Sequence, residues 1–124
     1  MRINKKSRSA IKLIFFSFVV LAILIGSMSP YPIPMFFQYS DKVYHFTAFF
    51  VLTLMVLFLL GNRLIVACCS LVLLGGAIEL YQGLLLPMRT SSSLDFIANS
   101  AGVFFGTILY YIITLTRNKF EHCI

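Results

Sequence analysis

Charged residues are scarce in this chain, and their scarcity excludes a soluble enzyme module. Asp, Glu, Lys and Arg together make up 11% of the 124 residues, whereas 60% are hydrophobic. A soluble domain of this length has roughly a quarter of its residues charged, because its surface must face water. The composition therefore predicts a surface that faces lipid, and the length allows a single domain over residues 1–124.

The sequence also lacks the cysteine and basic patterns that mark disulfide-rich, metal-binding or nucleic-acid-binding proteins. Its cysteines are Cys68, Cys69 and Cys123, an odd number without disulfide or metal-ligand spacing. The net charge of +6 comes with Lys and Arg that flank hydrophobic runs, without a basic-aromatic face or a binding motif. We therefore expect no metal, no cofactor and no nucleic-acid partner.

Four long apolar runs dominate the sequence. They cover residues 11–28, 43–60, 64–86 and 94–115, with short connections between them. Each run meets or approaches the length of about 20 residues that a helix needs to cross a bilayer. Backbone polar groups in lipid must be satisfied within the segment, which favours helices over strands. The sequence therefore predicts an all-α, polytopic membrane protein with a bundle of about four transmembrane helices.

The first run permits two interpretations. Its basic start and apolar stretch are typical of a cleaved signal peptide. The apolar core is long, however, and the small residues Gly26, Ser27 and Ser29 continue directly into Pro30, which favours an uncleaved helix. Because the polar candidates described below all lie beyond this run, we expect residues 1–28 to form an anchor helix outside the polar core.

Lys and Arg are divided unequally between the two sides of the predicted bundle. With the N-terminus inside, the cytoplasmic set is Arg2, Lys5, Lys6, Arg8, Lys12, Arg63, Arg117 and Lys119. The outer set contains only Lys42 and Arg89. Since short cytoplasmic loops carry the excess of Lys and Arg, this asymmetry predicts that both termini are cytoplasmic.

Three of the four acidic residues lie near the outer ends of the predicted helices. Asp41 begins the second helix, Glu79 lies within the third, and Asp95 begins the fourth. The polar residues that share their side are Lys42, His45, Gln82, Arg89 and Asn99. Ionisable groups within a membrane are costly and normally face the bundle interior or a water-filled cavity. We therefore expect His45, Glu79 and Asp95 to border one polar pocket that opens to the outer face.

Helical spacing places these residues on shared faces. Residues at i,i+3 and i,i+4 are neighbours on a helix surface. The groups that share a face are Asp41 with His45, Glu79 with Gln82, and Asp95 with Asn99, Gly102 and Gly106. Gly102 and Gly106 also form a small-xxx-small pair, which lets another helix approach closely.

Each candidate also has a simpler interpretation. Asp41 and Asp95 could cap helix N-termini, where a carboxylate suits the helix dipole. His45 could simply bond to Asp41, or it could transfer a proton. Glu79 lies toward a helix C-terminus, where the dipole disfavours an anion, so it is the strongest functional candidate.

The candidate residues fall into two groups. The candidate catalytic residues are His45, Glu79 and Asp95, and the candidate ligand-binding residues are Asp41, Lys42, Gln82, Arg89 and Asn99. Lys42 and Arg89 could snorkel to the interface, form ion pairs with the carboxylates or hold an anionic lipid head group. A metal site built from His45 and carboxylates has no ligand-spacing motif, so none is predicted.

The candidate residues fall into four short motifs within a core of residues 41–106. These motifs are Asp41-Lys42-x-x-His45-Phe46, Glu79-x-x-Gln82, Pro87-x-Arg89 and Asp95-x-x-x-Asn99-x-x-Gly102. In this order and spacing they resemble the VanZ-like family of small membrane proteins, which is named for a teicoplanin-resistance protein. The resemblance implies a bacterial cytoplasmic membrane, a process in the cell envelope and a link to glycopeptide resistance, without a settled catalytic mechanism.

Together, the residues and the resemblance predict action at the outer leaflet. The predicted target is an envelope lipid, a lipid-linked cell-wall precursor or an amphiphilic glycopeptide antibiotic, and membrane lipids are the expected partners. The residues fit a catalyst and equally a binding protein that performs no chemistry. They do not indicate an oligomeric state. The alternatives are a small proton-coupled transporter and a structural membrane partner without a ligand of its own. The position of Glu79, away from the bilayer centre, speaks against the transporter.

Overall fold

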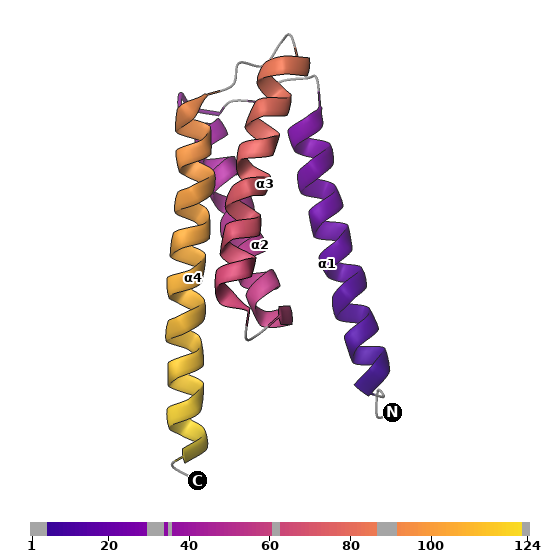
Figure 1. The fold of residues 1–124 in the computed structure, drawn as a ribbon, viewed down its shortest axis with the longest axis vertical. Coiled ribbons are helices and arrows are strands. Elements are labelled where there is room, and N and C mark those ends of the chain that lie inside the picture. The colour runs from indigo at the N-terminus through magenta and orange to yellow at the C-terminus, as the bar shows by residue number, and fades with distance from the viewer. Residues whose placement is uncertain (1–4, 30–33, 35, 61–62, 87–91, 123–124) are drawn as a thin grey trace.

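The computed structural model describes residues 5–29, 34, 36–60, 63–86 and 92–122. These residues form four helices and no strand: α1 (Lys5–Met28), α2 (Ser40–Leu60), α3 (Leu64–Leu85) and α4 (Ser93–His122) (Figure 1). All four are long and apolar enough to cross a membrane. The predicted all-α bundle of about four transmembrane helices is therefore confirmed.

The ends of α3 and α4 follow from local sequence. The amide of Leu86 still donates to the carbonyl of Gln82 at 3.2 Å, but Leu86 itself is extended, with φ −111° and ψ 99°. The next residue is Pro87, and a residue before proline is disfavoured in the helical region. At its far end, α4 continues seven residues past the apolar run predicted to end at residue 115. Its 30 residues span about 45 Å, more than the roughly 30 Å hydrocarbon core of a bilayer.

Two glycines let α4 pack directly on the backbone of α2. A Cβ atom built on Gly102 would lie 2.5 Å from the carbonyl oxygen of Phe46 and 2.9 Å from the amide nitrogen of Phe50. A Cβ atom built on Gly106 would lie 3.0 Å from the carbonyl oxygen of Phe50 and from Cβ of Thr53. The close approach predicted from the small-xxx-small pair is confirmed, and α2 is the helix that approaches.

The buried apolar core comes from α2, α3 and α4. Among the described residues it consists of Phe49, Leu52, Val56, Leu57, Ala67, Leu71, Ile78 and Val103. Helix α1 adds only partly buried side chains at the edge of this core: Phe16, Val20, Ile23 and Leu24. It leans away from the other helices toward its start, and α1 begins at the same end of the bundle at which α4 ends (Figure 1). The opposite end, where α1 and α3 end and α2 and α4 begin, holds the candidate residues.

Candidate functional site

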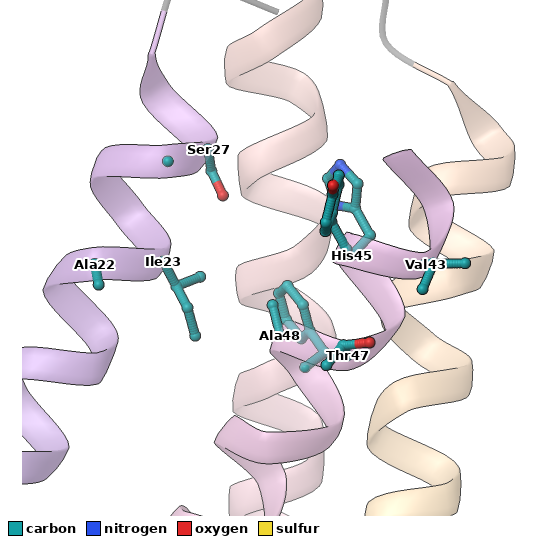
Figure 2. A pocket seen from close by; sticks show the side chains of 10 residues that line it. Ala22, Ile23, Ser27, Val43, His45, Thr47 and Ala48 are labelled. Carbon is teal, nitrogen blue, oxygen red and sulfur yellow. The ribbon is translucent and has the colours of Figure 1, made fainter. Parts of the chain in front are cut away.

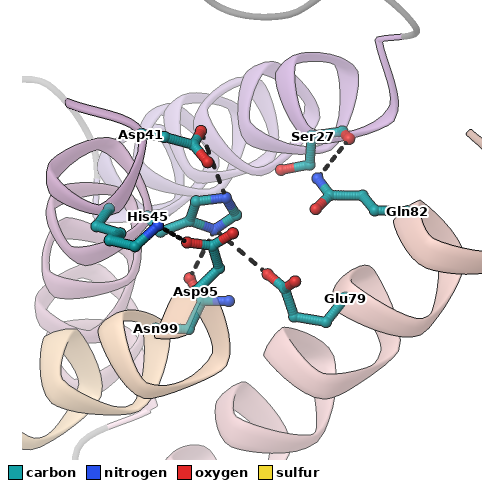
Figure 3. Close-up of polar contacts among 8 residues, drawn as sticks. Ser27, Asp41, His45, Glu79, Gln82, Asp95 and Asn99 are labelled. Carbon is teal, nitrogen blue, oxygen red and sulfur yellow. Dashed lines mark hydrogen bonds and ion pairs between the residues drawn. The ribbon is translucent and has the colours of Figure 1, made fainter. Parts of the chain in front are cut away.

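Three helices bring the predicted catalytic residues together at this end of the bundle. His45 comes from α2, Glu79 from α3 and Asp95 from α4, and their side chains point toward one another (Figure 3). All three are at least 92% buried. We call His45 and the five residues around it the polar cluster: Asp41, Lys42, His45, Glu79, Asp95 and Asn99. The structure therefore brings together the residues that the helical spacing predicted to meet, while their chemical roles stay predictions.

His45 is the centre of the polar cluster. Its Nδ1 lies 3.0 Å from Oδ1 of Asn99 and 3.7 Å from Oε1 of Glu79. Its Nε2 lies 3.9 Å from Oδ1 of Asp41, too far for a hydrogen bond. An amide oxygen and a carboxylate only accept hydrogen bonds, so Nδ1 carries the proton that it donates to Asn99. His45 is therefore held by Asn99 on another helix rather than by Asp41 on its own, and Nε2 stays available.

Lys42 and Asp95 form a salt bridge between α2 and α4. Lys42 Nζ donates to Oδ1 of Asp95 at 3.1 Å, and the two side chains are 28% and 5% exposed. The Asp95 carboxylate therefore pairs with a cation on another helix, a role that helix capping alone does not give it. Lys42, in turn, has a partner inside the protein and is not a free cation for an anionic head group.

Glu79 is the least satisfied member of the polar cluster. Its side chain is 8% exposed, and neither Oε1 nor Oε2 has a hydrogen-bond partner among the described residues. The main-chain amide of Ser92 points toward this carboxylate. Asn99 Nδ2 and Ser40 Oγ are also buried without a described partner. Since an unsatisfied buried polar group costs about 1–3 kcal/mol, these groups form a site with unused hydrogen-bonding capacity.

Gln82, another of the predicted ligand-binding residues, makes its hydrogen bond outside the polar cluster. Gln82 is buried and its Nε2 donates to the backbone carbonyl of Ser27 at 2.8 Å, which ties α3 to the end of α1 (Figure 3). Arg89 lies outside the described residues. The role of Ser27 was missed because a main-chain carbonyl leaves no signal in the sequence.

An apolar groove beside His45 was also missed, because its shape depends on how two helices diverge. This α1–α2 groove has a volume of about 500 Å³ (Figure 2). Its lining residues are Ala22, Ile23, Gly26, Ser27, Val43, Tyr44, His45, Thr47, Ala48 and Phe49. A second cleft of about 410 Å³ lies between the same helices farther from the polar cluster, around Phe15 and Leu54. Because His45 lines the groove, it joins an apolar surface to the polar cluster.

One side of the polar cluster has the composition of a metal site. One ligand atom from each of Asp41, His45 and Asp95 lies within 4.8 Å of the other two. These residues come from two helices and are separated by up to 54 positions. Folding therefore brings together a set of metal-ligand residues that no local sequence motif reveals.

Comparisons with protein-family models, curated proteins and solved structures gave no match to this chain. The resemblance to the VanZ-like family therefore rests on the four motifs and stays a prediction. Residues from three of those motifs meet in the polar cluster: Asp41, Lys42, His45, Glu79, Asp95 and Asn99. The fourth motif, Pro87-x-Arg89, lies outside the described residues.

Proposed function

We propose that this chain binds an amphiphile of the cell envelope at the outer leaflet of a bacterial cytoplasmic membrane. The apolar tail of the amphiphile lies in the α1–α2 groove, and its polar head reaches the polar cluster. The observation that supports this proposal is the position of His45, which lines the groove and also contacts Asn99. Binding sites for small molecules typically combine a largely apolar cavity of about 300–1,000 Å³ with a few polar groups.

The net charge of the polar cluster limits which head groups can bind to it. With all three carboxylates ionised and His45 neutral, the single ammonium of Lys42 leaves the polar cluster with two net negative charges. Such a cluster repels a bare phosphate and favours a head that offers hydroxyl, amine or amide donors. The sugar and peptide portion of a lipid-linked cell-wall precursor has this chemistry, and so does an amphiphilic glycopeptide antibiotic. The same residues could also act on the bound head, because Nε2 of His45 is free to accept a proton.

The test is to close the groove without touching the polar cluster. Ala48→Phe places a ring in the groove, whereas Ala77→Phe places the same ring on the exposed face of α3. The measured quantity is the stabilisation of the purified protein by a lipid-linked cell-wall precursor. We expect Ala48→Phe to weaken binding by about tenfold or more, equal to about 1.4 kcal/mol, and Ala77→Phe to bind normally. Normal binding by Ala48→Phe would show that the groove is not the tail site.

The proposal also requires the polar cluster to face outward, with both termini in the cytoplasm. Single cysteines at exposed positions 36, 63 and 117 test this in a chain whose native cysteines are replaced. A membrane-impermeant maleimide added to intact cells should label the cysteine at position 36 and spare those at positions 63 and 117. Labelling at positions 63 and 117 instead would place the polar cluster on the cytoplasmic side and refute action at the outer leaflet.

A further inference from the structure

We propose that Asp41, His45 and Asp95 form a binding site for a divalent transition-metal ion, in which Glu79 and Asn99 orient His45. The three ligand residues already gather within 4.8 Å, at the start of α2 and α4. Two carboxylates and an imidazole are ligand types that Zn²⁺ accepts, with water completing the coordination. The mixed oxygen and nitrogen set favours Zn²⁺ or Mn²⁺ over Mg²⁺, which takes oxygen ligands and keeps several waters.

His45 has the hydrogen-bond pattern that is common among metal-binding histidines, with one ring nitrogen donating and the other free to coordinate. Nδ1–H donates to Asn99 Oδ1 at 3.0 Å and faces Glu79 Oε1 at 3.7 Å. This leaves the lone pair of Nε2 on the side of Asp41, 3.9 Å away. Histidines that bind metals almost always donate their other ring N–H to a carboxylate or an amide or backbone oxygen, which fixes the tautomer and the orientation of the ring.

Glu79 supplies a second and independent indication of a cation. Its carboxylate is aimed at His45, its side chain is 8% exposed, and neither oxygen has a hydrogen-bond partner in the described chain (Figure 3). A buried carboxylate without a hydrogen-bond partner is expensive within a membrane. A divalent ion on the other side of the imidazole would balance the two net negative charges of the polar cluster and would strengthen the electrostatic attraction between the imidazole and Glu79.

Lys42 competes with the metal for Asp95. Its Nζ occupies Oδ1 of Asp95 at 3.1 Å, and its side chain is 28% exposed, so it has room to swing toward water. A tetrahedral ion with ligands at about 2.0–2.2 Å holds them roughly 3.4 Å apart, so the three side chains must also draw closer by about 1 Å. Asp41, with a 29% exposed side chain, has the freedom to make this movement. Metal binding thus replaces the ammonium of Lys42 with a divalent ion.

The experiment measures Zn²⁺ binding to the full chain purified in detergent, with no cell-wall precursor or antibiotic added. Cys68, Cys69 and Cys123 are replaced by Ser and His122 by Ala, because thiolates and the tail imidazole would bind Zn²⁺ elsewhere. Elemental analysis after gel filtration gives the stoichiometry, and competition with a chromophoric chelator gives the affinity. We expect a single Zn²⁺ ion per chain. Asp41→Asn and Asp95→Asn should abolish this binding, and Glu79→Gln should weaken it by about 10–100-fold.

The Lys42→Met substitution distinguishes a metal site from a purely structural salt bridge between Lys42 and Asp95. Removing the competing ammonium should raise the affinity for Zn²⁺, whereas a purely structural salt bridge would leave Zn²⁺ binding absent or unchanged. Thr114→Val, at the far end of α4, is the control and should bind as the parent chain does. No Zn²⁺ in the parent chain, binding that survives Asp95→Asn, or an affinity that does not rise in Lys42→Met would each overturn the proposal. Because no precursor or antibiotic is present, the outcome is independent of the proposed function.

Discussion

Glu79→Gln should abolish the function of the chain in cells while leaving its fold nearly unchanged. Glutamine keeps the shape of the side chain and one acceptor oxygen, but it removes the charge that faces His45 at 3.7 Å. Because neither carboxylate oxygen has a described hydrogen-bond partner, neutralisation breaks no ion pair with Lys42, which is bonded to Asp95. It also relieves the cost of a buried charge. The expected loss is about 10–100-fold if Glu79 orients His45 as outer-shell carboxylates orient metal-bound histidines.

Envelope lipidomics measures this loss in a strain whose copy of the chain is deleted and then restored in wild-type or variant form. Immunoblots of the membrane fraction and thermal melts in detergent must accompany it. We expect the melting temperature of Glu79→Gln to change by less than about 4 °C, or about 1 kcal/mol for a chain of this size. Ser92→Ala, which keeps the main-chain amide that faces Glu79, is the matched control and should restore function fully.

Two outcomes would count against a functional role for Glu79. The first is a Glu79→Gln chain that restores the wild-type lipid profile. The second is a chain that fails only because it disappears from the membrane. Either would favour the structural alternative, in which the contacts of the polar cluster serve to fasten α2 and α4 together.

Gly102→Ala should destabilise the bundle more than a methyl group added at Gly26, Gly75, Gly76 or Gly106. The new Cβ would lie 2.5 Å from a carbonyl oxygen and 2.9 Å from an amide nitrogen of α2. Backbone atoms cannot rotate away as a side chain does, so the two helices must move apart. Overpacking of this kind costs about 1–3 kcal/mol, and the intrinsic gain of about 1 kcal/mol from replacing glycine in a helix offsets only part of it.

Gly26→Ala is the matched control for this substitution. Gly26 is also within a helix, but a Cβ atom built on it has nothing within 4 Å. Unfolding followed by heat in one detergent should show Gly102→Ala melting below the wild-type chain and Gly26→Ala melting at or above it. Equal melting of the two variants would mean that α2 and α4 do not approach each other as closely as described.

The helices could be predicted because apolar runs of bilayer length leave few alternatives. The start of α3 matches the predicted run. Helix α2 begins at Ser40, three residues before its apolar run and one before Asp41, the predicted first residue. The end of α4 was placed too early at residue 115, because hydropathy stops at Arg117 whereas helical hydrogen bonding continues to His122. Hydropathy predicts where the lipid-facing segment ends, but a helix can continue beyond that point.

The meeting of the polar residues could also be predicted, but their pairing could not. Spacing along one helix placed Asp41 beside His45, and the structure gives His45 a closer partner in Asn99, from α4. The bond from Lys42 to Asp95 likewise crosses between helices. Such contacts depend on the rotation and distance of one helix relative to another, which the glycines of α4 set and no local spacing encodes.

The hydrogen bond from Gln82 to α1 has a consequence for how sequences with this architecture can change. Gln82 donates to the carbonyl oxygen of residue 27, a group that every amino acid supplies in the same place. Residue 27 can therefore vary without loss of this tie, provided that α1 remains a helix ending near the same depth. Gln82, by contrast, has to present an amide. Natural variation should therefore accumulate in the first helix faster than in the three that carry the polar cluster.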